Sequence, residues 1–209
     1  MSGVAVLRGN NAAERHNAAA VGVGLWVFMG VATALFSLFI AAYAMRMDAS
    51  DWSAITMPWQ LWLSTVLLVA GSTALQLANG AASTAVKTAH WAPARALLLA
   101  GGACALIFLG VQLWAWQALL AIHVGPAGNP AASFFYLLTA LHGLHVAGGL
   151  VAWAVTARSL WHDAGAARNA WRIALCARYW HFLLALWLLL FATLGGLTPE
   201  VVRFICGTN

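Results

Sequence analysis

The sequence predicts an all-α, polytopic membrane protein with five transmembrane helices. Of its 209 residues, 63% are hydrophobic and only 7% are charged, whereas soluble domains carry about 25% charged residues. Five stretches free of Asp, Glu, Lys and Arg are long enough to cross about 30 Å of hydrocarbon. They are residues 19–45, 59–79, 96–121, 132–157 and 179–198. This composition excludes a water-soluble domain, a nucleic-acid-binding protein and a disordered chain.

The first span has an apolar run of about 27 residues, longer than the roughly 7–15 apolar residues of a cleaved signal peptide. The run ends at Arg46 and more spans follow, so we expect it to remain as a helix. The polar residues 1–18 are predicted to form a cytoplasmic N-terminal tail. Residues 19–209 are predicted to form a single five-helix transmembrane domain.

Proline positions agree with the limits of the later spans. Pro58, Pro93 and Pro130 come just before a span, and Pro199 comes just after one. Proline is tolerated in the first turn of a helix and beyond its end, because no intrahelical hydrogen bond is lost there.

The basic residues predict the orientation, because cytoplasmic loops carry an excess of Lys and Arg. With the N-terminus in the cytoplasm and the C-terminus in the periplasm, only Arg46 and Arg203 lie outside. The inside segments then hold eight basic residues: Arg8, Arg15, Lys87, Arg95, Arg158, Arg168, Arg172 and Arg178.

A stripe of polar residues follows one face of the second span, namely Thr65, Ser72, Gln76 and Asn79. Their spacing of 7, 11 and 14 residues returns to the same side of an α-helix. Such stripes usually hydrogen-bond a neighbouring helix in the membrane. A polar pore lining is the sharper alternative. No span contains a carboxylate, which disfavours a proton-coupled pump or carrier.

Histidines inside the spans are the candidates for binding. His142 and His145 are three residues apart on one face of the fourth span, and His181 begins the fifth. His142 and His181 are expected at depths that differ by about 15 Å, too far apart to share a haem. No cysteine or carboxylate lies near enough in sequence to complete a metal shell. We therefore expect neutral histidines that hydrogen-bond a helix or a lipid headgroup, and no metal or cofactor.

The inner end of the last span carries a basic and aromatic cluster of Arg178, Tyr179, Trp180 and His181. These residue types anchor a helix at the headgroups, and a basic pocket between helices there binds anionic lipid. Membrane anchoring without a bound lipid is the simpler interpretation.

Two segments carry a family resemblance. Residues 133–153 read SFFYLLTALHGLHVAGGLVAW and residues 179–191 read YWHFLLALWLLLF. Both resemble subunit III of the haem–copper terminal oxidases, whose members show F-H-G-L-H-V and, before the last helix, Y-W-H-F. Residues 25–43 and the segment FLGVQLWAW at 108–116 resemble further motifs of that family, in the same order. Five spans also resemble its short bacterial form.

The resemblance implies an accessory subunit that binds no haem or copper itself, packs beside catalytic subunit I with subunit II, and holds phospholipid. His142, His145, Tyr179, Trp180 and His181 correspond to lipid-cleft or interface residues of the family, and Arg178 to a contact with a lipid headgroup. The sequence departs from the family at three acidic positions, where it has Ala32, Ala115 and Leu184. These departures weaken any role in proton uptake.

The resulting hypothesis is a non-catalytic subunit III of a bacterial respiratory oxidase, in the cytoplasmic membrane, which reduces oxygen with electrons from cytochrome c or quinol. The spans 19–45 and 59–79 are predicted to pair, with a lipid-filled groove separating them from the other three. The alternatives are a related protein associated with a nitric oxide reductase, a stand-alone transporter, and a haem-binding cytochrome that uses His142 or His145.

Overall fold

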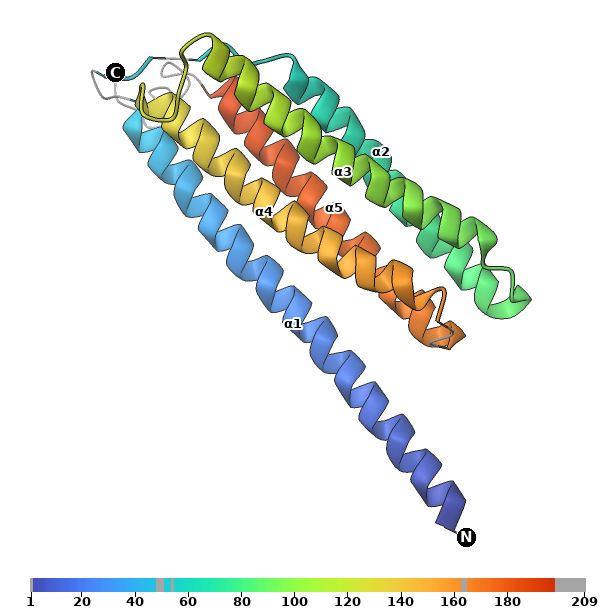
Figure 1. The fold of residues 1–209 in the computed structure, drawn as a ribbon. Coiled ribbons are helices and arrows are strands. Elements are labelled where there is room, and N and C mark those ends of the chain that lie inside the picture. The colour runs from blue at the N-terminus through green and yellow to red at the C-terminus, as the bar shows by residue number, and fades with distance from the viewer. Residues whose placement is uncertain (1, 48–50, 54, 163–164, 198–209) are drawn as a thin grey trace. The chain divides into compact units, whose positions relative to one another are not determined.

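The chain folds as five long α-helices (Figure 1). The computed structural model describes residues 2–47, 51–53, 55–162 and 165–197, and the side chains from residue 19 onward. The described part contains no strand, and each helix includes a stretch long and apolar enough to cross a membrane. The predicted all-α class and the five spans are confirmed. The helices are α1 Ser2–Arg46, α2 Gln60–Thr88, α3 Ala92–Ala121, α4 Pro130–Ser159 and α5 Ala166–Gly196.

The chain divides into two compact units, residues 1–36 and residues 37–209. The first unit is the N-terminal part of α1, which is helical from Ser2 onward. The backbone of the predicted polar tail is therefore helical over residues 2–18. The second unit holds the end of α1 and the four helices α2 to α5. The single domain expected over residues 19–209 stays a prediction.

Helices α2 and α5 extend well beyond one end of their predicted spans. The second span was expected to end at Asn79, but α2 continues to Thr88, where Ala89 adopts a left-handed conformation (φ 57°) and donates its N–H to the Ala85 carbonyl at 2.8 Å. The fifth was expected to begin at Tyr179, but α5 begins at Ala166. Hydropathy marks the part of a helix that suits lipid, whereas the backbone hydrogen bonds continue through polar residues until a turn intervenes.

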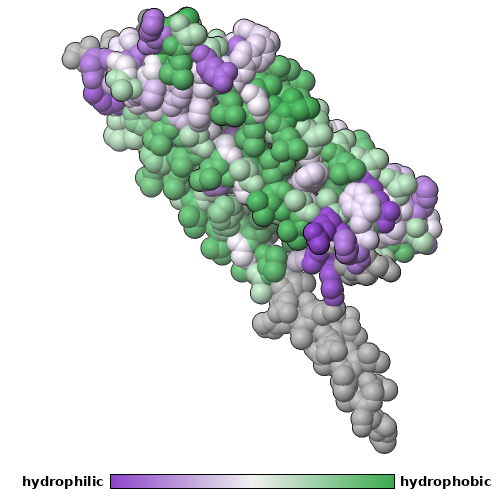
Figure 2. Space-filling model, in the orientation of Figure 1, coloured by the Kyte–Doolittle hydropathy of each residue, from purple (hydrophilic) through white to green (hydrophobic). Residues whose placement is uncertain are grey.

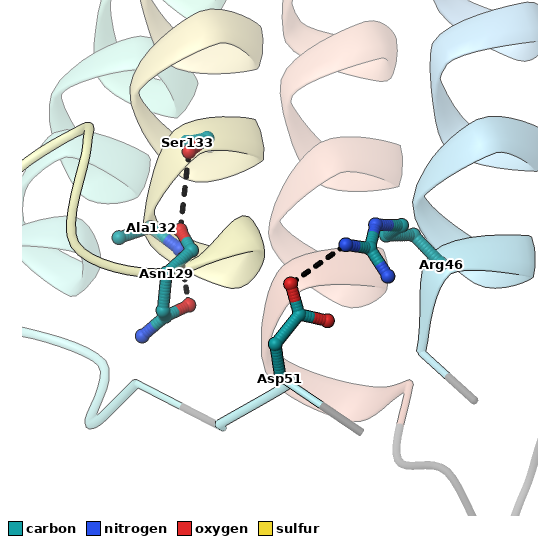
Figure 3. Close-up of polar contacts among 5 residues, drawn as sticks. All are labelled: Arg46, Asp51, Asn129, Ala132 and Ser133. Atoms are coloured by element: carbon teal, nitrogen blue, oxygen red, sulfur yellow. Dashed lines mark hydrogen bonds and ion pairs between the residues drawn. The ribbon is translucent and has the colours of Figure 1, made fainter. Parts of the chain in front are cut away.

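Helices α3 and α4 begin as their prolines predicted, with Pro93 and Pro130 in the first turn. At α4, the side chain of Asn129 accepts a hydrogen bond from the Ala132 N–H at 3.1 Å, and the Ser133 hydroxyl donates to the Asn129 carbonyl at 3.1 Å (Figure 3). An Asn at this position satisfies one of the backbone N–H groups that a helix start leaves unpaired.

The four helices of the second unit form a closed ring of contacts. Helix α2 packs against α3 and α5, and α4 packs against the same two helices. The predicted groove between the second span and the last three is wrong, because α2 is part of their bundle. Large apolar side chains fill the interior, among them Trp187, Phe108 and Leu183.

Glycines allow close approach in this ring at Gly101, Gly102 and Gly149. A Cβ atom at Gly101 would lie 2.6 Å from Leu75 of α2, and one at Gly102 would lie 2.1 Å from the Trp153 ring of α4. No atom lies within 4 Å of a Cβ placed at Gly148 or Gly196, so these two glycines face open space.

The surface of the bundle suits a membrane. Figure 2 shows hydrophobic residues over the middle of the helices and hydrophilic residues gathered toward their ends. Leu106, Leu144 and Val151 are each more than half exposed although apolar. Exposed apolar surface of this extent requires lipid or another protein to cover it.

Candidate functional site

The two segments HGLHV and YWHF meet at the interface between α4 and α5. The Tyr179 hydroxyl donates to the backbone carbonyl of His145 at 3.0 Å. The Tyr179 ring lies over Gly149, where a Cβ atom would be only 2.9 Å from its Cε1. Tyr179 therefore fits a notch that the glycine of α4 leaves open. The two motifs form one packing unit although they are more than thirty residues apart in the sequence.

The two histidines of α4 have different surroundings. The side chain of His142 is fully buried, with its ring 5.2 Å from Trp187 and 5.8 Å from Phe108 between centroids. His145 is half-buried, and its Nδ1 lies 2.7 Å from the Leu141 carbonyl of the preceding turn. Because a carbonyl only accepts, that bond places the proton on Nδ1. The histidines share a helix face but not an environment.

His181 lies at the interface between α2 and α5, and both of its ring nitrogens are hydrogen-bonded. Nε2 lies 3.0 Å from the Gln76 Oε1, and Nδ1 contacts the Ser72 hydroxyl. The pattern assigns a neutral ring in which Nε2–H donates to Gln76 and Nδ1 accepts from Ser72. The His181 ring thus links the two helices through side-chain hydrogen bonds, and it is exposed on the surface of the bundle.

The polar stripe of α2 bonds the neighbouring helix as predicted. In addition to Ser72 and Gln76, Thr65 accepts a hydrogen bond from the Trp187 indole at 2.9 Å. Three of the four stripe residues therefore pair with α5. Each such bond between membrane helices is worth roughly 0.6–2 kcal/mol.

The basic and aromatic cluster at the start of the last span divides between the surface and the interior. Arg178 is exposed, as is His181. Tyr179 and Trp180 are buried, with 7% and 2% of their surface exposed. The aromatic pair therefore packs against other helices of this chain, and Arg178 and His181 are the members that face outward. Their contact with lipid or with a partner stays a prediction.

The geometry holds no obvious cofactor site. Among the described residues, no group of three or more His, Cys, Asp or Glu side chains is arranged to hold a metal ion. His142 contacts Trp187, which lies six residues along α5 from His181, an axial offset of about 9 Å. The two histidines also face different neighbours. The absence of a haem or metal in this chain remains an expectation.

Sequence reasoning missed the roles of two polar residues, the buried Gln112 and the partly buried Arg95. Gln112 of α3 is 5% exposed, and Arg95 donates to the Leu160 carbonyl at the end of α4 at 2.6 Å. A signal for Gln112 was present, because it is the one amide within the apolar segment FLGVQLWAW. Arg95 looked like an ordinary cytoplasmic charge, since its carbonyl partner is 65 residues away.

The helices, their apolar surface and their polar interfaces define an all-helical, multi-pass membrane protein whose described interior serves helix packing. No family model matches the chain. It is 28% identical to the cytochrome bo(3) ubiquinol oxidase subunit 3 of Pseudomonas aeruginosa over 80% of both chains. It is also 28% identical to two cytochrome c oxidase subunits 3, from Alkalihalophilus pseudofirmus and Thermostichus vulcanus, over 81% and 84% of this chain and 82% and 87% of theirs. These similarities, which extend over about four fifths of the chain, support a relationship to the subunit III family of the haem–copper oxidases.

Proposed function

We propose that this protein is the non-catalytic subunit III of a bacterial haem–copper respiratory oxidase. In that complex, oxygen is reduced to water with electrons from cytochrome c or quinol. The observation that carries the proposal is the pairing of the HGLHV and YWHF segments into one packing unit, joined by the bond from Tyr179 to the His145 carbonyl. Relatives named as oxidase subunit 3, similar over four fifths of the chain, support it.

The proposed mechanism is structural. The broad apolar surface packs against catalytic subunit I, with subunit II in the same complex, and phospholipid fills the remaining contacts. Chemistry by this chain is disfavoured, because all five acidic residues of the sequence lie outside the apolar spans. Haem and copper are proposed to reside in the partner subunits.

Residues of the proposed lipid and partner contacts follow from exposure. Arg178 and His181 face outward, so they are the candidates for a lipid headgroup or a partner helix. His142, Tyr179 and Trp180 are buried, and their proposed role is to hold the surface in shape. The protein is proposed to lie in the bacterial cytoplasmic membrane with its N-terminus inside, because eight of ten basic residues then face the cytoplasm.

A pull-down of the tagged full chain in mild detergent tests the proposal. We expect a many-spanning catalytic oxidase subunit by mass spectrometry and haem bands in a reduced-minus-oxidised spectrum. A colourless chain that elutes alone contradicts the proposal. Copurification with a nitric oxide reductase favours that alternative, and substrate uptake by the reconstituted chain favours a transporter. A Soret band from the isolated chain favours a cytochrome.

A matched pair of adjacent glycines sharpens the test. Gly149→Leu fills the notch that Tyr179 occupies, whereas Gly148→Leu adds a side chain where no atom lies within 4 Å. If the shape of the packing unit matters for assembly, Gly149→Leu lowers the yield of the complex. A loss with Gly148→Leu alone would place a partner directly on that exposed face of α4. An oxidase that lacks this chain but keeps its assembly, turnover and inactivation rate would contradict the proposed stabilising role.

A second experiment addresses lipid. Phospholipid that copurifies with the complex is counted by mass spectrometry in the wild type and in Arg178→Gln. We expect the variant to retain its partner subunits and to lose anionic phospholipid, because the exposed guanidinium is the proposed headgroup contact. Unchanged lipid content contradicts the role of Arg178.

A further inference from the structure

Two buried polar side chains in the middle of the bundle have no hydrogen-bond partner among the described residues. His142 of α4 is 0% exposed and Gln112 of α3 is 5% exposed. Both ring nitrogens of His142 and both amide atoms of Gln112 are enclosed and unpaired. Each is an entire polar group enclosed by the bundle, and the two come from facing helices.

The register of α3 against α4 puts Gln112 and His142 at a similar level of the interface. The Phe108 ring lies 5.8 Å from the His142 ring, and the Trp116 indole donates to the Thr139 hydroxyl at 3.1 Å. Gln112 is four residues from both Phe108 and Trp116, so all three lie along one side of α3. Its position therefore falls between the two contacts, opposite residues 139–142 of α4.

The same interface is hydrogen-bonded on both sides of this point. Toward one end, the Trp153 indole donates to the Leu98 carbonyl at 2.8 Å. Toward the other end, Trp116 donates to Thr139. Gln112 and His142 lie between these two bonds, near the middle of both helices. At the central level of the α3–α4 interface, two whole polar groups therefore remain unpaired among the described residues.

Unpaired polar groups at this depth are costly, because neither lipid nor the apolar interior supplies a partner. Buried polar groups in native proteins are almost always paired, either with protein atoms or with an ordered internal water. The structure forms no direct bond between Gln112 and His142.

We propose that Gln112 and His142 together bind one internal water molecule between helices α3 and α4. A neutral imidazole offers one donor and one acceptor, and a carboxamide offers an acceptor and two donors. Water accepts a bond from one side chain and donates to the other, in either direction. The water supplies the central polar link of this interface, between the Trp153 and Trp116 bonds. This inference does not depend on the proposed function.

Magnetic resonance on the wild-type full chain in lipid bilayers, with any subunits that copurify, tests the water directly. With ¹⁵N-labelled histidine, we expect magnetisation transfer from water protons to the ring nitrogens of His142, identified by their absence in His142→Phe. In Gln112→Leu this transfer is expected to fall by at least half, while the signal of His145 keeps its intensity. No transfer from water to His142 in the wild type overturns the proposal.

A thermal-unfolding cycle tests whether the two residues share the water. Gln112→Leu and His142→Phe each remove one ligand, so each is expected to lower Tm. The double variant is expected to lose less than the sum of the two, because no polar group is left without a partner. Additive losses overturn the proposal, as does coupling without the water signal, which indicates a direct bond. Gln60→Leu is the matched control: a buried glutamine at the start of α2, expected to be additive with His142→Phe.

Discussion

Two interfaces of the bundle hold a histidine in different ways. One lies between α2 and α5, and the other lies between α3 and α4. At α2–α5, His181 has both ring nitrogens paired with side chains of α2, yet the ring is exposed. At α3–α4, His142 is fully buried, yet it pairs with no described residue. The exposed histidine is therefore held by hydrogen bonds to a neighbouring helix, whereas the enclosed one is packed between aromatic rings.

The difference teaches what each interface tolerates. The α2–α5 contact depends on directional bonds between polar side chains, each worth about 0.6–2 kcal/mol in a membrane. The α3–α4 contact depends on shape, because Gly102 admits the Trp153 ring and Phe108 lies against His142. Removing one hydrogen bond at α2–α5 leaves the other bonds in place. Adding a side chain at a closely packed glycine of α3–α4 displaces the ring that packs there.

The largest expected loss of stability comes from adding a side-chain atom at Gly102, where the Trp153 ring of α4 packs against α3. In Gly102→Ala, the new Cβ lies 2.1 Å from the Trp153 ring, so the ring must move and its bond to the Leu98 carbonyl is lost. We expect a loss of about 3 kcal/mol in the free energy of unfolding, measured by unfolding in mixed detergent micelles. Gly110→Ala, on the same helix with no atom within 4 Å, is the control and is expected to be neutral. Equal stability of both variants would show that close packing at Gly102 does not determine the stability of the α3–α4 interface.

The second-largest loss of stability is expected when the hydrogen bonds of His181 to α2 are removed. His181→Phe keeps an aromatic ring but removes both hydrogen bonds, leaving Ser72 and Gln76 without their partner. We expect a loss of about 2 kcal/mol by the same measurement. The double variant Ser72→Ala/Gln76→Leu, placed in the His181→Phe background, is expected to restore part of this loss. No restoration would mean that the ring, not its bonds, holds the interface.

A smaller effect is expected at α4–α5, which combines one directional bond with a shaped notch. Tyr179→Phe retains the ring over Gly149 and loses the hydroxyl that donates to the His145 carbonyl. We expect a loss of about 1 kcal/mol, visible as a modest fall in Tm. Tyr43→Phe is the control, because its hydroxyl has no hydrogen bond with the described residues while its ring packs on Trp52 and Phe134. A loss at Tyr179 as large as at His181 would contradict this ranking.

The smallest loss of stability is expected outside both interfaces, at an exposed ion pair. It serves as the reference against which the losses at the interfaces are compared. Arg46 and Asp51 form an ion pair of 2.7 Å near the end of α1 (Figure 3), with 43% and 57% of their side chains exposed. Asp51→Asn is expected to cost about 0.3 kcal/mol at low salt, because exposed pairs are screened. At 1 M salt the difference should vanish, since screening then acts within a few ångströms. A cost that persists at high salt would indicate a role other than the ion pair.

The fold class could be predicted from the sequence because hydropathy, helix length and proline position are local properties. The bonding role of the polar stripe on α2 was also predictable, since helical periodicity places Thr65, Ser72 and Gln76 on one side. The ends of α2 and α5 were not, because residues 80–88 and 166–178 are too polar for lipid yet still form helix. Hydropathy cannot distinguish a polar helix outside the membrane from a loop.

What the sequence by itself determined is which segments are helices, which of them suit lipid, and which family the motifs resemble. Only the tertiary structure decided which helices are neighbours and which side of each motif is buried. It placed α2 inside the bundle, put Tyr179 and Trp180 in the interior, and enclosed both Gln112 and His142. The physical reason is that such pairings join residues dozens of positions apart. They depend on how whole helix surfaces fit together, and no local pattern records that fit.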